Sequence, residues 1–345
     1  MQWAVLVAAS IGLSVLLLSV HAPAALLLGP LIASMAVAAG GAQLRLPLTP
    51  FVFAQGIVGS MIAKMVPLSI VGDVVGHWVL FTGGVLSVVA VSSLLGWAMT
   101  RLQMLPGTTA LWGTSPGAAS VMTLMAEAYG ADPRLVAIMQ YLRVLMVAAV
   151  AAAVARIFGI TPEHRAAMVW FPPVDGLALG ETIALAIIGP IIAQRLNIPA
   201  GAFLVPLVIG LVLSHFGLMK IEQPPWLLAA CYTMIGWNIG LRFTRSLLVH
   251  AAKALPRILV CVFIMIALCG GVAVVLVVVA KVDPLTAYLA TSPGGADSIA
   301  IIAASSNVDV SFVMAMQTVR LIAVLVLAPI LTRFIVERMN VPPAP

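Results

Sequence analysis

Charged side chains are scarce in this sequence. The 17 Lys and Arg and the 11 Asp and Glu residues make up 8% of its 345 positions, whereas 63% are hydrophobic. Soluble domains carry about 25% charged residues, so too few charges remain here to cover a water-soluble surface. We therefore expect lipid as the solvent. The high hydrophobicity also excludes an intrinsically disordered chain.

Cysteine and histidine are rare as well. The three cysteines each lie in an apolar stretch, which excludes a disulfide framework or a CxxC metal site. No two of the five histidines stand four residues apart, the spacing that places two imidazoles on one metal. P-loop, nucleophile-elbow and HExxH motifs are also absent. We therefore expect no enzyme, no catalytic residue, no metal, no cofactor and no ATP-driven pumping.

Long apolar segments are abundant. A helix needs roughly 20 apolar residues to cross a hydrocarbon core, and we expect such segments at residues 3–19, 22–40, 49–66, 76–99, 106–129, 134–158, 178–195, 199–217, 225–242, 257–280, 284–305 and 310–336. The first has no basic residue before it, so we interpret it as a retained helix rather than a signal peptide.

The net charge of +6 indicates Lys and Arg in cytoplasmic loops. The sequence predicts an all-α, multi-pass protein of the cell membrane, the inner membrane in a bacterium, with the lipid bilayer and no nucleic acid as a partner.

The two halves of the sequence repeat each other. The motif Thr-Ser-Pro-Gly (TSPG) at residues 114–117 returns 177 positions later at 291–294, and the same offset aligns Met-Gln-x-x-Arg at 139–143 with 316–320. Chance does not explain both motifs at one fixed spacing without a gap. We predict a duplicated unit, with repeat 1 at residues 1–158, a linker at 159–177 and repeat 2 at 178–345.

Each TSPG motif interrupts an apolar segment near its middle. Proline blocks the preceding helical turn but suits the first turn of a new helix, with serine as the N-cap. Arms of about 10 residues at 1.5 Å per residue reach about halfway across the membrane. The break therefore lies near the midplane, in either a re-entrant hairpin or a broken helix that crosses fully.

The distribution of basic residues favours the hairpin. If both interrupted segments are re-entrant, the repeats are inverted, and Arg45, Arg101 and the basic loop 242–257 share the cytoplasmic side with the N-terminus. If both cross fully, the loop 242–257 falls on the side opposite Arg45 and Arg101. We predict two inverted repeats, each of about five transmembrane helices plus one re-entrant hairpin or broken helix.

The two breaks are the first candidate site. Free N–H groups at a helix N-terminus carry positive partial charge, which suits an anionic group such as a carboxylate. We assign substrate binding to Thr114, Ser115, Pro116, Gly117, Thr291, Ser292, Pro293 and Gly294. The alternative is that Ser-Pro-Gly only caps a kinked helix in close packing.

The second candidate site is the Gln-x-x-Arg pair that follows each break. The spacing places Gln140 with Arg143, and Gln317 with Arg320, on one helix face inside an apolar segment. Each arginine could hold a substrate carboxylate with two hydrogen bonds. The alternative is a structural arginine that neutralises helix C-termini or an acid such as Glu127.

Two acids and one amide complete the candidates. Asp297 closely follows the second break, whereas its counterpart in the first repeat is Ser120. This asymmetry suits a single coupling site for a proton or Na⁺, although a permanent salt bridge between Asp297 and an arginine stays open. Glu127, near the end of the first interrupted segment, is the second ion-coupling candidate. Asn238 could line the substrate path.

The TSPG breaks, each followed by Met-Gln-x-x-Arg, resemble the AbrB membrane protein family, also labelled ammonia monooxygenase or AbrB duplication proteins. The resemblance covers nearly the whole chain and is specific at residues 109–156 and 286–333. It implies a grouping with inverted-repeat secondary transporters, including citrate- and bile-acid-type carriers. It therefore implies an elevator-like transporter and a homodimer. The sequence contains no cluster of metal-binding residues that would support the label of monooxygenase.

We therefore expect a secondary transporter coupled to H⁺ or Na⁺. Its substrate is expected to be a small organic anion, bound near the midplane between the two TSPG breaks. Two other classes stay open. One is a membrane-bound regulatory protein without transport. The other is a membrane monooxygenase, which would require bound copper or iron.

Overall fold

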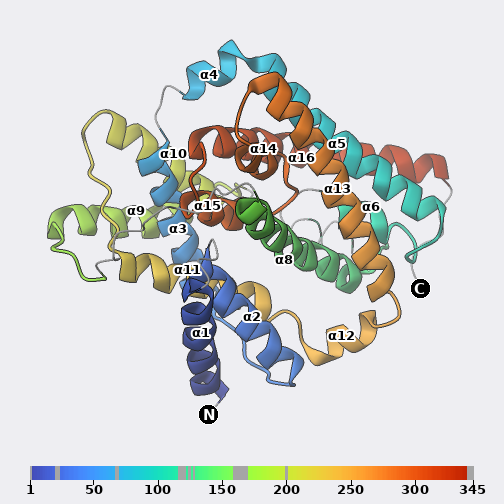
Figure 1. Ribbon diagram of the computed structural model, residues 1–345, viewed down its shortest axis with the longest axis horizontal. Helices are drawn as coiled ribbons and strands as arrows, with labels where there is room; N and C mark the ends of the chain where they lie inside the picture. The colour runs from blue at the N-terminus through green and yellow to red at the C-terminus, as the bar shows by residue number, and fades with distance from the viewer. Residues whose placement is uncertain are drawn as a thin grey trace. The chain divides into compact units, whose positions relative to one another are not determined.

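Helices form all the secondary structure in the described part of the chain. The computed structural model describes residues 2–19, 24–66, 70–115, 122, 126, 129–157, 170–198 and 201–339, and no strand occurs among them. Six of the helices in these ranges are long and apolar enough to cross a membrane (Figure 1): α1 (Gln2–Ser19), α3 (Leu48–Met65), α5 (Trp78–Arg101), α8 (Pro133–Ile157), α9 (Gly176–Arg195) and α13 (Leu255–Ala280). The predicted all-α polytopic class is confirmed.

The remaining helices are shorter, apart from the last. They are α2 (Ala25–Ala39), α4 (Ile70–Gly76), α6 (Thr109–Thr114), α10 (Gly201–His215), α11 (Pro225–Gly240), α12 (Arg245–Ala251), α14 (Pro284–Thr291), α15 (Ala296–Ala304) and α16 (Val310–Met339). Most bounds agree with the expected apolar segments. The helices α4 and α12 were not predicted, because seven residues are too few to register as a membrane segment.

The helices of the two halves begin at corresponding positions. Adding the offset of 177 to the first residues of α3, α5 and α8 gives the first residues of α11, α13 and α16. An offset of 176 relates α2 to α10, with an internal proline at the equivalent position in both. The duplication seen in the motifs therefore extends to the order and bounds of the helices.

The chain divides into two compact units, and each takes helices from both halves. Unit 1 comprises Met1–Gly72, Ala155–Arg245 and Asp297–Ser311, and unit 2 comprises Asp73–Val154, Ser246–Ala296 and Phe312–Pro345. A compact unit is therefore not the same thing as a sequence repeat. Helices α1 to α3 and α9 to α11 belong to unit 1, and both TSPG breaks begin in unit 2.

Glycines bring the helices of unit 1 into backbone contact. A Cβ added to Gly236 of α11 would meet the carbonyl oxygen of Leu27 in α2, and one added to Gly59 of α3 would meet that of Phe203 in α10. The two contacts are equivalent under the repeat. The lack of a side chain at Gly59 and Gly236 therefore permits the close approach of these helices.

The contacts also give the directions of these helices. Gly59 lies against Phe203, and four residues later Ala63 lies against Gly210, so α3 and α10 run the same way. By the same reasoning α2 and α11 run the same way, because Gly236 lies at Leu27 and Gly240 at Ser34.

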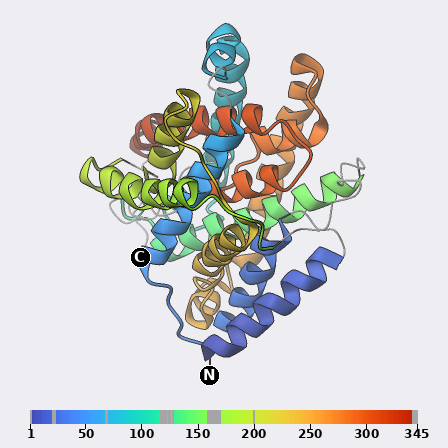
Figure 2. The same ribbon diagram turned by 90° about the vertical axis from the view of Figure 1, so that its left-hand side faces the viewer.

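Sequential helices in unit 1 run in opposite directions. Ser14, late in α1, meets Gly29, early in α2, and Leu6 of α1 packs with Ala38 at the end of α2. Figure 2 draws α1 and α2 side by side near the N-terminus. The pair α9 and α10 is antiparallel in the same way, with Gly189 against Pro206 and Ala193 against Gly201.

Unit 2 is built around α5 and α13. These helices pack against each other, and each also packs against the short helix that precedes a break, α6 or α14. The rings of Phe81 of α5 and Phe312 of α16 pack at a tilt of 48°, with their centroids 5.4 Å apart. The hydroxyl of Tyr288 in α14 donates to the carbonyl oxygen of Val147 in α8 at 3.2 Å, which joins the second repeat to the first.

Candidate functional site: two helix breaks and their Gln-x-x-Arg clamps

The first break follows α6. Ser115 leaves the helical conformation at φ −58° and ψ 124°, because the residue before a proline is disfavoured in the α region. The hydroxyl of Thr114 donates to the carbonyl oxygen of Ala110 at 2.9 Å, and that of Ser115 donates to Leu111 at 2.8 Å. These hydroxyls therefore donate within their own helical turn. Pro116 and Gly117 lie outside the described residues.

The second break follows α14 and has the same geometry. Ser292 is extended, with φ −62° and ψ 136°, and the next helix, α15, starts only at Ala296. The hydroxyl of Thr291 donates to Ala287 at 2.9 Å and that of Ser292 to Leu289 at 3.1 Å. Helix arms of 8 and 9 residues are each about 12 to 14 Å long. The predicted interruption of the second apolar segment is confirmed.

A buried pair, Gln140 and Arg143, binds the end of α6; we call it the first clamp. The amide nitrogen of Gln140 donates to the carbonyl oxygens of Trp112 at 3.0 Å and Ser115 at 3.1 Å. Arg143 Nη1 donates to the same Ser115 oxygen at 3.0 Å, and Nη2 donates to Gln140 Oε1 at 2.6 Å. Arg143 is only 1% exposed.

The second clamp, Gln317 and Arg320, binds the end of α14 in an equivalent way. The amide nitrogen of Gln317 donates to Leu289 O at 2.6 Å and to Ser292 O at 3.4 Å. Arg320 Nη1 donates to Ser292 O, and Nη2 donates to Gly294 O at 2.9 Å. The clamp therefore spans the break from the last helical turn to the unwound backbone.

The clamps satisfy carbonyl groups that would otherwise have no donor. An unpaired backbone group in a water-free interior costs several kcal/mol, and the negative end of a helix dipole attracts a cation. Of the two roles left open for Arg143 and Arg320, the geometry shows the one in which a guanidinium neutralises a helix C-terminus. Contact with a substrate stays a prediction.

Both clamps belong to unit 2, where the helix α14 of the second break contacts α8, the helix that carries the first clamp. Arg143 and Arg320 are 1% and 3% exposed. One cation comes from each repeat. The described part of unit 2 thus holds two buried positive charges beside two unwound segments.

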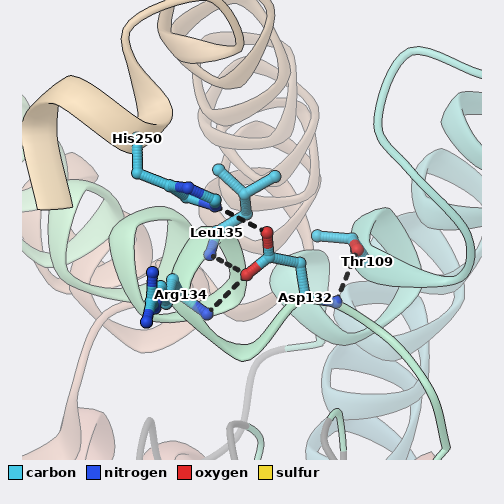
Figure 3. A network of polar contacts seen from close by, with 5 residues as sticks. All are labelled: Thr109, Asp132, Arg134, Leu135 and His250. Atoms are coloured by element: carbon cyan, nitrogen blue, oxygen red, sulfur yellow. Dashed lines mark hydrogen bonds and ion pairs between the residues drawn. The ribbon is translucent and has the colours of Figure 1, made fainter. Parts of the chain in front are cut away.

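A polar network ties the start of α6 to the start of α8 (Figure 3). The backbone N–H of Asp132 donates to Thr109 Oγ1 at 3.1 Å, and Asp132 Oδ1 caps α8 by accepting from the N–H groups of Arg134 at 2.8 Å and Leu135 at 3.2 Å. His250 Nε2 of α12 pairs with Asp132 Oδ2 at 2.8 Å. The sequence places His250 in the basic loop but contains no signal for this pair.

The other three predicted residues are Glu127, Asp297 and Asn238. Glu127 and the side chain of Asp297 lie outside the described residues, although the backbone of Asp297 belongs to α15. Asn238 is half-buried in α11 and belongs to unit 1. Its backbone carbonyl accepts from Arg242 Nε at 3.2 Å.

A cavity of about 510 Å³ in unit 1 has no signal in the sequence. The cavity lies where α3 and α10 end, and Lys64, His215, Lys220 and Glu222 are among its lining residues. Lys64 and His215 stand in the last turns of these helices, where a positive charge stabilises the C-terminus.

Across the described ranges, no three His, Cys, Asp or Glu side chains gather as metal ligands do.

Comparison with known proteins identifies the family. Residues 26–336 match the family described as "Transition state regulatory protein AbrB". "Putative regulator AbrB" of Escherichia coli (strain K12) is 45% identical over 337 residues, 97% of each chain. "Uncharacterized protein YhjN" of Bacillus subtilis (strain 168) is 25% identical over 304 residues, 80% of this chain and 76% of that protein. No solved structure matches the chain. The chain therefore belongs to the AbrB family.

Proposed function

We propose that this protein is a secondary active transporter for a small organic anion, coupled to H⁺ or Na⁺. The observation that carries the proposal is the pair of helix breaks, each held by a fully buried Gln-x-x-Arg clamp. Unwound backbone at membrane depth is tolerated where it is buried in protein or lines a cavity, and transporters place substrate and ion sites at such breaks.

The contact at the base of the first interrupted segment supports a re-entrant hairpin. Thr109, at the start of α6, is hydrogen-bonded to Asp132, just before α8. A segment that crossed the membrane fully would place its two ends about 30 Å apart. The chain therefore enters and leaves on one side, and the break lies at the tip of the hairpin.

The helix directions in unit 1 support inverted repeats. If α1, α2 and α3 cross in turn, α2 and α3 point in opposite directions. Helix α10 runs parallel to α3, and it is therefore antiparallel to α2, its counterpart in the first repeat. The division into two units that each mix both repeats supports alternating access by movement of one unit against the other.

The charges near the breaks favour an anionic substrate. Arg143 and Arg320 are both buried, and a buried cation is costly unless a negative group is close. A carboxylate bound near both guanidinium groups lowers this cost.

Asp297 is the acid that we assign to coupling, with Glu127 as the second candidate. Protonation or Na⁺ binding there would change the local charge as the anion binds or leaves.

Gradient-driven uptake into proteoliposomes tests the proposal. We expect uptake of at least one small organic acid under an inward H⁺ or Na⁺ gradient, and loss of the gradient dependence in Asp297→Asn. Arg320→Lys keeps the charge but not the forked hydrogen bonds, so uptake should fall. The control is Arg45→Met, an exposed loop position. Unchanged uptake in both Arg320→Ala and Asp297→Asn would overturn the site assignment.

Two alternatives are separated by other measurements. A regulatory membrane protein without transport would show no uptake and no stabilisation by any small acid, amine or amino acid in a thermal-shift screen. A membrane monooxygenase would retain copper or iron after purification, which elemental analysis detects. Names such as "Putative regulator AbrB" describe relatives, and no contact in the described residues favours regulation over transport.

A further inference from the structure

The two clamps differ in the acceptor of the arginine Nη2 group, and in a long contact from Gln140 Nε2 to Gly113 O at 3.4 Å that only the first clamp has. In the first clamp, Gln140 Oε1 accepts from Arg143 Nη2 at 2.6 Å. In the second clamp, Arg320 Nη2 donates instead to Gly294 O at 2.9 Å. Gln317 Oε1 consequently has no donor among the described residues, although Gln317 is completely buried. The two clamps therefore share their contacts to the serine carbonyl groups of Ser115 and Ser292, but only the first supplies a donor to its glutamine oxygen.

The orientation of the Gln317 amide is fixed by its neighbours. Its Nε2 lies 2.6 Å from Leu289 O and 3.4 Å from Ser292 O, so a flipped amide would place an oxygen against two acceptor oxygens. The unpaired atom is therefore the oxygen. Arg320 Nε is buried and has no acceptor in the described ranges either, and the same holds for Arg143 Nε of the first clamp, so only the glutamine oxygen distinguishes the two. Unpaired groups of this kind call for a specific partner.

The neighbouring charges restrict what that partner can be. An ionised carboxylate only accepts hydrogen bonds, so no acid of the protein in that form can serve Gln317 Oε1. A cation would lie beside the Arg320 guanidinium, and the nearby oxygens of Ser292 and Gly294 already accept from Arg320. The group that suits Gln317 Oε1 is therefore an uncharged donor such as a hydroxyl.

We propose that the second break, rather than the first, recognises the substrate, and that the substrate is a hydroxy-carboxylate. Its hydroxyl donates to Gln317 Oε1 while its carboxylate accepts from Arg320 Nε. This inference rests on the proposed transport of a small organic anion and adds the chemical class of that anion. Recognition through a buried acceptor disfavours the analogue without the hydroxyl, because the acceptor is then left unpaired.

Matched acids test the inference on the purified full-length protein. Lactate, propionate and alanine form one set, and malate, succinate and aspartate form a second. Each set shares a carbon skeleton and varies only the hydroxyl, hydrogen or ammonium group. We expect the hydroxy acid of at least one set to bind roughly 5- to 100-fold more tightly than its deoxy partner, measured by thermal shift and calorimetry. We expect the amino acid to bind no better than the deoxy acid.

The repeat supplies a matched control variant. Gln317→Met and Gln140→Met each remove an amide that binds carbonyl groups at a helix end, so both lower stability. Only Gln317→Met also removes the unpaired oxygen. We expect Gln317→Met to lose the preference for the hydroxy acid and Gln140→Met to keep it. If Gln317→Met does not fold, Gln317→Glu retains an acceptor oxygen at the position and should keep the preference with weaker binding.

The outcomes separate this inference from the proposed function. Equal binding of hydroxy and deoxy acids by the unmodified protein would overturn the inference, because a water molecule then suffices for Gln317 Oε1, while transport of organic anions would stand. Preference retained in Gln317→Met would overturn it as well. Failure of every acid to bind or be transported would overturn the proposed function itself.

Discussion

Two buried arginines determine the character of the site at the scale of single residues. Arg143 and Arg320 are at most 3% exposed, and each donates to a carbonyl oxygen at the end of a short helix. Their planar, forked donors bind two acceptors in a fixed geometry that the single ammonium group of a lysine does not provide. The sequence predicted buried arginines beside the breaks, but it could not decide between a helix end and a substrate as the partner.

Removing a clamp arginine should destabilise the protein. Arg143→Met leaves Ser115 O and Gln140 Oε1 with fewer donors, and we expect a loss of about 2 to 4 kcal/mol in the free energy of unfolding. Thermal unfolding in detergent measures the change. Arg45→Met, at an exposed position, should lie within about 0.5 kcal/mol of the unmodified protein. Equal unfolding temperatures for the two variants would contradict a structural role of the clamp.

At the scale of helices, most bounds follow from the sequence because a membrane restricts length and polarity. The two seven-residue helices, α4 and α12, escaped prediction because no such restriction applies to them. The interruption at Ser292 was predictable because proline and glycine act locally. The hydrogen bond between Thr109 and Asp132 was not, because it joins residues 23 positions apart that only the tertiary structure brings together.

Glycine contacts between helices should be sensitive to one methyl group. Gly236→Ala places a Cβ 2.8 Å from the Leu27 oxygen, so α2 and α11 must separate, at a cost of about 1 to 3 kcal/mol. A Cβ added to Gly83 of α5 would meet no neighbouring segment within 4 Å. Gly83→Ala should therefore leave stability unchanged or raise it by up to about 1 kcal/mol. Unfolding temperatures in detergent measure both changes, and similar losses in both variants would show that close packing is not the cause.

The cap at the start of α8 can be separated from the ion pair it shares with α12. Asp132→Ala removes both the cap and the pair with His250. We expect the free energy of unfolding to fall by about 1 to 2 kcal/mol. Asp132→Asn keeps a capping oxygen and removes only the charge. Its free energy of unfolding should therefore fall by less than about 1 kcal/mol. Unfolding temperatures of the two variants, compared with His250→Ala, provide the measurement. A larger loss in Asp132→Asn than in Asp132→Ala would be inconsistent with capping.

At the scale of the whole molecule, the proposed inversion of the repeats predicts which loops share a side of the membrane. The loop after α2 holds Arg45, whereas Lys64 and Lys220 line one cavity where α3 and α10 end. Single cysteines at Lys64 and Lys220 should react together with a membrane-impermeant maleimide, from the side opposite a cysteine at Arg45. The three native cysteines are buried, so background labelling should be low. Labelling of the cysteine at Lys220 from the same side as the cysteine at Arg45 would overturn the inversion.

The sequence by itself determined the class, the positions of most helices, the duplication and the breaks. These features depend on composition and on local backbone chemistry, which need no knowledge of distant contacts. The tertiary structure decided what each buried polar group contacts. It placed the Gln-x-x-Arg pairs on the ends of α6 and α14 and left Gln317 Oε1 unpaired among the described residues, because hydrogen-bond partners far apart in the chain are fixed only when helices pack.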